Sequence, residues 1–113
     1  MKKILFVILL VLFFASSVFA HPPTRIEISY DKSTSILTAK ITHPVEDPDR
    51  HYVSKVDVAV NGKEILEHKL SRQDNADYRI VTYLIPDVKE GDTISVEGYC
   101  SIMGKKEEGI KVK

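Results

Sequence analysis

The run Leu37-Thr38-Ala39-Lys40-Ile41-Thr42-His43 alternates apolar and polar residues, and this period of two is typical of a β-strand with one buried face. A second run, Thr93-Ile94-Ser95-Val96-Glu97-Gly98-Tyr99-Cys100, alternates in the same way. In each run the apolar face ends on a residue that can bind a metal, His43 in the first and Cys100 in the second. The sequence therefore predicts buried strands whose ends carry potential ligands.

The rest of the chain after residue 20 also alternates short β-branched segments with turn signals, without a long amphipathic helix. Asn61-Gly62 is the strongest hairpin signal, because these residues accept positive φ. Further turns are expected at Asp31-Lys32-Ser33-Thr34 and Lys89-Glu90-Gly91-Asp92. We predict an immunoglobulin-like antiparallel β-sandwich of about seven strands, at residues 25–30, 35–42, 52–60, 64–70, 78–85, 93–99 and 109–112. Four residues of the third strand are expected to point inward: Tyr52, Val56, Val58 and Val60.

The first 20 residues are typical of a cleavable signal peptide. Met1-Lys2-Lys3 is a short basic segment, residues 4–14 are an unbroken apolar run, and Val18-Phe19-Ala20 is a small-residue cleavage site. The apolar run is too short for a comfortable membrane span. We therefore expect an exported, periplasmic or extracytoplasmic protein with no membrane span after cleavage. Its single domain, residues 21–113, would begin with His21, whose α-amine and imidazole can chelate a metal together.

The composition of this domain excludes some functional classes. Removing Lys2 and Lys3 leaves 14 basic against 16 acidic side chains, interspersed along the chain. This balance provides no basic field for nucleic acid or anionic lipid. Hydrolase motifs such as G-x-S-x-G are also missing.

The chain has one cysteine, so no internal disulfide can form. Cys100 can be a buried small hydrophobe, an intermolecular disulfide partner or a metal ligand. The last interpretation gains weight from His21, His43 and His51, because a thiolate combined with imidazoles suits iron, copper or zinc. Taken singly, each histidine is more readily explained as a solvated or capped surface histidine, and only the combination with the cysteine favours a metal site.

Three ordered motifs resemble the iron-binding domain of superoxide reductases, the desulfoferrodoxin and neelaredoxin family. His21-Pro22-Pro23 is similar to the His-x-Pro near the start of that domain. His43-Pro44 and His51-Tyr52 are similar to its His-Pro turn and following His-Tyr strand start, although this loop is two residues longer. The segment 99–104, Tyr-Cys-Ser-Ile-Met-Gly, partly matches its Tyr-Cys-Asn-x-His-Gly turn.

The resemblance implies one ferrous ion per chain, with Cys100 as the axial ligand and His21, His43 and His51 as three equatorial ligands. The family's fourth equatorial histidine falls on Met103, and a thioether is a weaker donor to Fe(II) than imidazole. Met103 is therefore either a weak ligand or a gap-filling apolar residue.

His68 is the remaining histidine of the chain. It lies in an apolar strand, as either a core or edge histidine or a replacement ligand.

Three functions remain open from the sequence. The first is superoxide reduction at the iron, catalytic or degenerate, with electrons from a separate rubredoxin-like donor because the chain lacks a rubredoxin cysteine cluster. The second is an extracytoplasmic copper carrier, since an N-terminal histidine with Met103 and Cys100 suits copper. The third is a metal-free sandwich that binds other proteins. The oligomeric state does not follow from the sequence.

Overall fold

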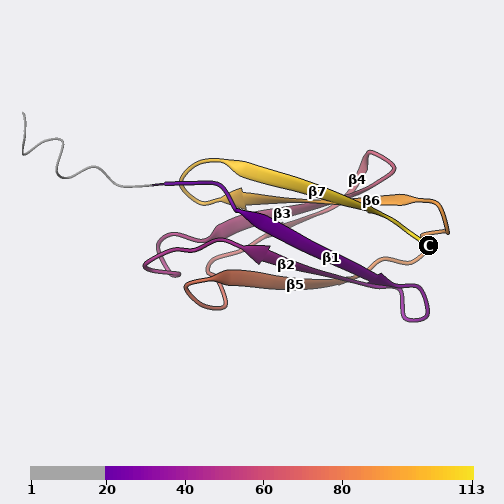
Figure 1. The fold of residues 1–113 in the computed structure, drawn as a ribbon, viewed down its shortest axis with the longest axis horizontal. Helices are drawn as coiled ribbons and strands as arrows, with labels where there is room; N and C mark the ends of the chain where they lie inside the picture. The colour runs from indigo at the N-terminus through magenta and orange to yellow at the C-terminus, as the bar shows by residue number, and fades with distance from the viewer. Residues whose placement is uncertain (1–19) are drawn as a thin grey trace, which may run out of the picture.

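The computed structural model describes residues 20–113, which form seven antiparallel strands in two facing sheets (Figure 1). One sheet has the order β1-β2-β5 and the other has the order β4-β3-β6-β7. The strands are β1 (Arg25–Asp31), β2 (Ile36–Thr42), β3 (Val53–Val60), β4 (Lys63–Lys69), β5 (Tyr78–Leu84), β6 (Thr93–Cys100) and β7 (Lys105–Lys111). This arrangement confirms the predicted all-β sandwich. The predicted leader, residues 1–20, lies outside the described residues except for Ala20.

The predicted turns are present. The β3–β4 hairpin turns at Asn61 and Gly62, with φ of 50° and 82°. Positive φ at both central residues is what a tight hairpin with the right-handed strand twist requires. Between β1 and β2, the Asp31 carboxylate accepts a hydrogen bond of 2.9 Å from the backbone N–H of Ser33. Such a side-chain bond two residues ahead stabilises a turn locally.

The core lies between the sheets and is built from alternate residues of several strands. Leu37, Ala39 and Ile41 of β2 are fully buried, and His43, directly after β2, continues the same face without exposed surface. The buried face of β6 ends at Cys100, which is 8% exposed. The predicted strand parity is therefore confirmed for both strands.

β3 departs from the predicted parity. Its pairing with β6 shifts register just after Val53, and the irregularity places Val53, not Tyr52, in the core. Tyr52 stays partly exposed, so its predicted inward position is wrong. Val56 and Val58 are buried as predicted, and Val60 packs partly buried against the core.

The last strand begins at Lys105, earlier than the predicted residue 109. Residues 105–108 are all charged, so apolar alternation is missing there. The segment is nevertheless a strand because its backbone pairs with β6, from Lys105 opposite Tyr99 to Lys111 opposite Thr93. Charged side chains are common on such an edge strand, where they discourage pairing with other chains.

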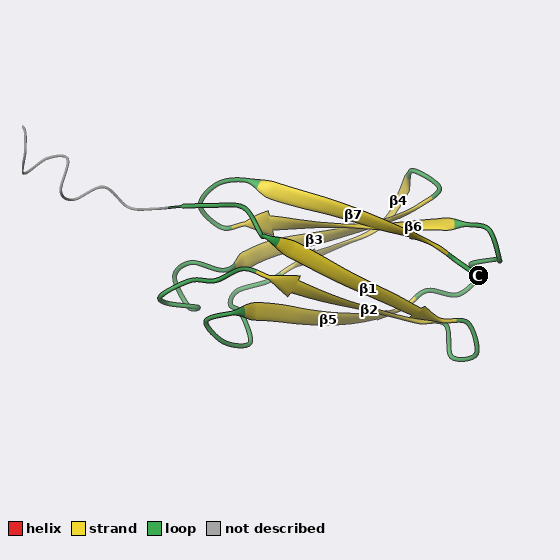
Figure 2. Cartoon of the chain, in the orientation of Figure 1, coloured by secondary structure: helices red, strands yellow, loops and turns green. Residues whose placement is uncertain are grey.

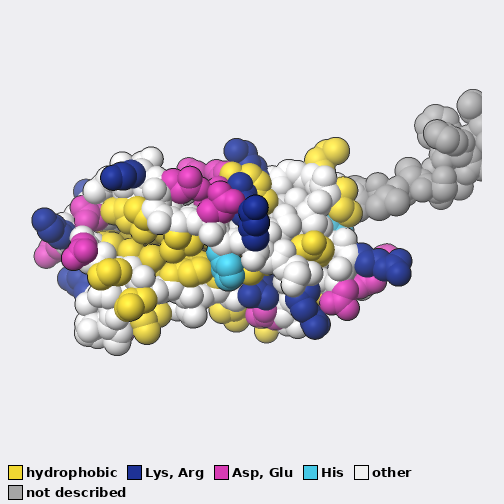
Figure 3. Space-filling view, turned by 180° about the vertical axis from the view of Figure 1, so that it is seen from behind, with side chains coloured by type: hydrophobic (Ala, Val, Ile, Leu, Met, Phe, Trp, Pro, Cys, Tyr) yellow, Lys and Arg dark blue, Asp and Glu magenta, His cyan; other side chains and the backbone are white. Residues whose placement is uncertain are grey.

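The sandwich is closed along one side, where β1 lies against β7, and open along the other, between the edge strands β4 and β5. Apolar side chains gather over this face in Figure 3, and a hollow there is lined by residues that include Leu66, Leu84 and Ile85. One hydrogen bond bridges the opening, between His68 Nδ1 and the Tyr83 hydroxyl at 2.8 Å. Among residues 20–113 there is no helix that could cross a membrane.

Candidate metal centre

Four candidate ligands come from four segments and meet at one end of the sandwich. His21 precedes β1, His43 follows β2, His51 precedes β3, and Cys100 ends β6. The start of β1 pairs with the end of β2, and the start of β3 pairs with the end of β6. Figure 2 shows the loops that adjoin these strand ends. The register of both sheets thus brings together residues up to 79 positions apart.

The three histidine rings form a compact group. The ring centroid of His43 lies 4.8 Å from that of His21 and 4.8 Å from that of His51, and the His21 and His51 centroids are 5.5 Å apart. One nitrogen of each ring lies within 4.8 Å of the others. Nitrogens that share an ion at about 2.0–2.1 Å are at most roughly 4 Å apart, so the three rings would have to move closer together to bind one ion.

Cys100 joins this group through His51. The Nε2 atom of His51 lies 3.1 Å from the Cys100 sulfur. The sulfur also faces two backbone N–H donors, those of Ile102 at 3.4 Å and Met103 at 3.5 Å. Hydrogen bonds to a thiolate favour its charged form, which is the form that binds metals. The turn after β6 thus places two backbone N–H groups next to the sulfur.

His43 is held by Gln73, a residue that the sequence analysis missed. Both side chains are fully buried, and the Nδ1 atom of His43 lies 2.6 Å from the Gln73 Oε1 atom. The other ring nitrogen of His43, Nε2, lies 3.0 Å from the backbone oxygen of His21. Gln73 belongs to the polar loop between β4 and β5, where no periodic pattern or motif in the sequence distinguishes it from its neighbours.

His21 is placed by contacts with two prolines. Its Nε2 atom lies 2.7 Å from the Pro44 carbonyl oxygen, and its Nδ1 atom lies 2.9 Å from the Pro22 carbonyl oxygen. Pro22 in turn packs on Gly104, since a Cβ added to Gly104 would lie 2.9 Å from the Pro22 Cβ atom. The turn that follows Cys100 thus supports the segment that carries His21.

His51 is presented by the turn that precedes β3. The backbone oxygen of Asp47 accepts hydrogen bonds from the N–H groups of Arg50 at 3.1 Å and His51 at 2.9 Å. Partial burial, followed by the proximity of His43 and His21, lowers the pKa of His51 below its ordinary value. A lowered pKa favours the neutral ring, which is the form that binds metals.

The other two candidates, Met103 and His68, have different surroundings. The Met103 side chain is 68% exposed, although its backbone N–H faces the Cys100 sulfur. His68 is on β4 and contacts Tyr83 of β5, with a ring-centroid separation of 5.5 Å. The structure therefore groups the rings of His21, His43 and His51, with the Cys100 sulfur in contact with His51, and places His68 beside Tyr83.

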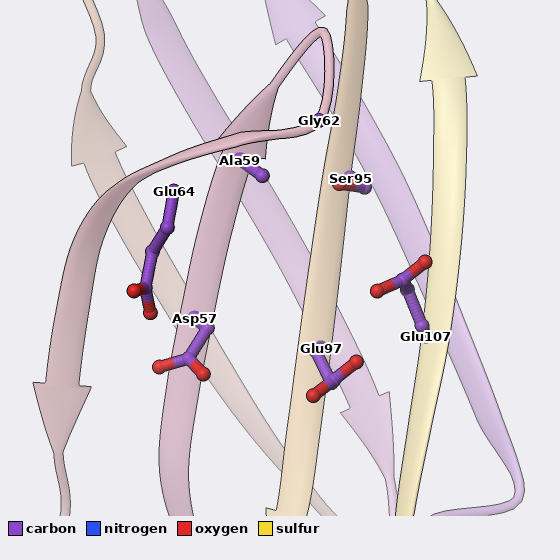
Figure 4. A pocket seen from close by; sticks show the side chains of 7 residues that line it. All are labelled: Asp57, Ala59, Gly62, Glu64, Ser95, Glu97 and Glu107. Carbon is purple, nitrogen blue, oxygen red and sulfur yellow. The ribbon is translucent and has the colours of Figure 1, made fainter.

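A second group of potential ligands lies on the outer face of the four-stranded sheet. Carboxylate oxygens of Asp57, Glu64 and Glu67 lie within 4.8 Å of one another. Figure 4 shows Asp57, Glu64, Glu97 and Glu107 around a shallow hollow of this face. The proximity of Asp57 is the main cause that raises the pKa of Glu64. Exposed acidic groups are frequent on protein surfaces without metals, so we assign no ion to this face.

Comparisons of the chain with family models, with characterised proteins and with solved structures found no match. The resemblance to superoxide reductases therefore stands on the motifs themselves.

Proposed function

We propose that this protein is an exported iron protein that binds one ferrous ion through His21, His43, His51 and Cys100 and reduces superoxide at it. The observation that carries the proposal is the convergence of three imidazoles and one nearly buried thiol at one end of the sandwich. These residues come from four segments in the order of the superoxide reductase motifs. The Cys100 sulfur, which contacts His51 Nε2, also faces two backbone N–H groups.

The donor set suits one-electron chemistry. A ferrous ion bound here would supply one electron to superoxide, which takes up two protons and leaves as hydrogen peroxide. A thiolate ligand raises the electron density at iron and favours this transfer. The oxidised centre then needs one electron from a separate donor, and a rubredoxin-like protein is the partner that the resemblance implies.

Copper binding or transport is the second candidate, and the number of donors favours it. Among residues 20–113, three imidazoles gather at this place, the Cys100 thiol contacts one of them, and the fourth histidine, His68, is engaged with Tyr83. Four donors of this kind suffice for copper, which prefers imidazole and sulfur ligands over oxygen. Iron in the superoxide reductases that the motifs resemble has one more imidazole, so a lower Fe(II) affinity is expected here.

Metal analysis of protein purified anaerobically from its native compartment separates the candidates. Iron near one atom per chain supports the first and copper supports the second. Protein without either metal would favour a metal-free sandwich. The functional assay is anaerobic Fe(II) titration followed by pulse radiolysis, in which the loaded protein should consume superoxide and form peroxide.

Two variants make this assay specific for the proposed site. His51→Ala removes a ring that contacts both His43 and the Cys100 sulfur, so it should abolish Fe(II) binding. His68→Ala removes a histidine outside the group and should leave binding unchanged. Equal loss in both variants, or binding retained in His51→Ala, would reject the proposed ligands.

A further inference from the structure

We propose that Gln73 is a positioning residue of the metal centre. Its side-chain amide holds the proton of His43 on Nδ1 and thereby leaves Nε2 as the nitrogen available to a metal. The assignment of the proton rests on the hydrogen bonds of the protein alone, and its effect on metal affinity rests on the proposed function.

The orientation of the Gln73 amide is determined by backbone groups. Its Oε1 atom accepts a hydrogen bond from the backbone N–H of Val53 at 3.0 Å. Its Nε2 atom donates to the carbonyl oxygens of His43 at 3.0 Å and Asn75 at 3.2 Å. A backbone N–H can only donate and a carbonyl can only accept, so a flipped amide would create three repulsive contacts in a fully buried place.

This orientation decides which nitrogen of His43 carries the proton. The Gln73 Oε1 atom lies 2.6 Å from His43 Nδ1 and has no hydrogen to donate, so Nδ1 must be the donor. A neutral ring with its proton on Nδ1 has its lone pair on Nε2. Hydrogen bonding of the second ring nitrogen is the usual way in which proteins orient metal-binding histidines.

The Nε2 atom of His43 faces the backbone of His21, the first residue of the histidine group. It lies 3.0 Å from the His21 carbonyl oxygen, and two lone pairs facing each other at this distance repel. The contact becomes favourable when Nε2 carries a positive partner, either a second proton or a metal ion. Gln73 thus fixes the ring of His43, whose centroid lies 4.8 Å from those of His21 and His51, with Nε2 as the nitrogen available to a metal.

Gln73 also ties the loop to the sandwich, so its structural role has to be separated from its positioning role. Gln73→Met keeps the approximate size and removes the acceptor for His43. Gln73→Glu keeps an oxygen facing both His43 and Val53 but loses the two donated hydrogen bonds. Asn75→Ala is a matched control for damage to the loop, because the Asn75 side chain caps the N–H groups of Asp77 and Tyr78 and does not touch His43.

The first experiment uses metal-free wild-type protein and long-range ¹H–¹⁵N NMR of the imidazole rings at pH 8. The expected result is a proton on Nδ1 of His43, with or without a second proton on Nε2. A proton on Nε2 alone would overturn the proposal. This measurement is independent of metal binding, so it stands even if the proposed iron site fails.

The second experiment is Zn(II) titration against a competing chelator for the wild type and the three variants. Gln73→Met should no longer hold the His43 proton on Nδ1. It should weaken Zn(II) binding by about 10- to 100-fold, the usual effect of removing such a hydrogen-bond partner. Gln73→Glu should keep Nδ1 protonated and bind within about tenfold of the wild type, even if it unfolds more easily. Unchanged affinity in Gln73→Met, or equal weakening in Asn75→Ala, would show that Gln73 acts only through loop stability. Wild-type protein that binds no Zn(II) but has the expected tautomer would reject the metal site and retain the assignment of the proton.

Discussion

Replacing Gly104 by alanine tests whether the turn after Cys100 holds His21 in place. Gly104 has a φ of 91°, and its added Cβ would lie 2.9 Å from Pro22 Cβ and 3.2 Å from Pro22 Cα. Ordinary carbon contacts begin near 3.4 Å, so Pro22 has to move. Because Pro22 directly follows His21, this movement displaces a proposed ligand.

The magnitude can be worked out from a matched control. Gly91 has the same φ of 91° and nothing within 4 Å of its added Cβ. Gly91→Ala should therefore lower the free energy of unfolding only through the backbone strain that it introduces, by about 1–3 kcal/mol. Gly104→Ala should lower the free energy of unfolding by a further ~1–3 kcal/mol, because the added methyl group overpacks against Pro22. If metal binding requires Pro22 to occupy its wild-type position, the overpacking energy of about 1–3 kcal/mol corresponds to roughly 5- to 150-fold weaker metal binding.

Urea denaturation of the metal-free variants measures the difference in the free energy of unfolding. Zn(II) titration measures the difference in metal affinity. Gly91→Ala should bind Zn(II) like the wild type, because its turn lies beyond the other end of β6. The reasoning is refuted if the two variants are equally destabilised, or if Gly104→Ala binds Zn(II) as tightly as Gly91→Ala.

Three further predictions concern single side chains. Cys100→Ser should remove thiolate charge-transfer absorption from the Co(II)- or Fe(II)-loaded protein, and a spectrum that keeps this band would exclude the thiolate as a ligand. His68→Ala should lower the free energy of unfolding by about 0.5–1.5 kcal/mol through loss of the Tyr83 hydrogen bond while Zn(II) affinity stays within about twofold; a larger change in affinity would place His68 at the metal. Asp57 raises the pKa of Glu64, so ionisation of Glu64 destabilises the fold as the pH rises through this pKa. Glu64→Gln should therefore unfold at a higher urea concentration than the wild type at pH 7, and this difference in midpoint should vanish near pH 3.5. A difference that persists at pH 3.5 would contradict the electrostatic cause.

Alternation and turn chemistry were sufficient to predict the sandwich. Leu37, Ala39 and Ile41 share a face because successive side chains of a strand point to opposite sides, a consequence of local backbone geometry. Asn61-Gly62 predicts its hairpin for a similarly local reason, the tolerance of positive φ. The errors arose where pairing with a neighbour overrides the local pattern: the shift at Val53 and the charged strand that begins at Lys105.

The candidate site also combines features that follow from local sequence with features that depend on tertiary packing. By itself, the sequence determined that His43 and Cys100 end buried faces, because parity follows from position along one strand. Only the tertiary structure decided that His21 and His51 lie beside them, that Met103 is exposed and that His68 contacts Tyr83. It also revealed Gln73, whose partners are up to 30 residues away. Register, sheet order and loop paths determine these contacts, and they depend on the packing of the whole chain rather than on any local run of residues.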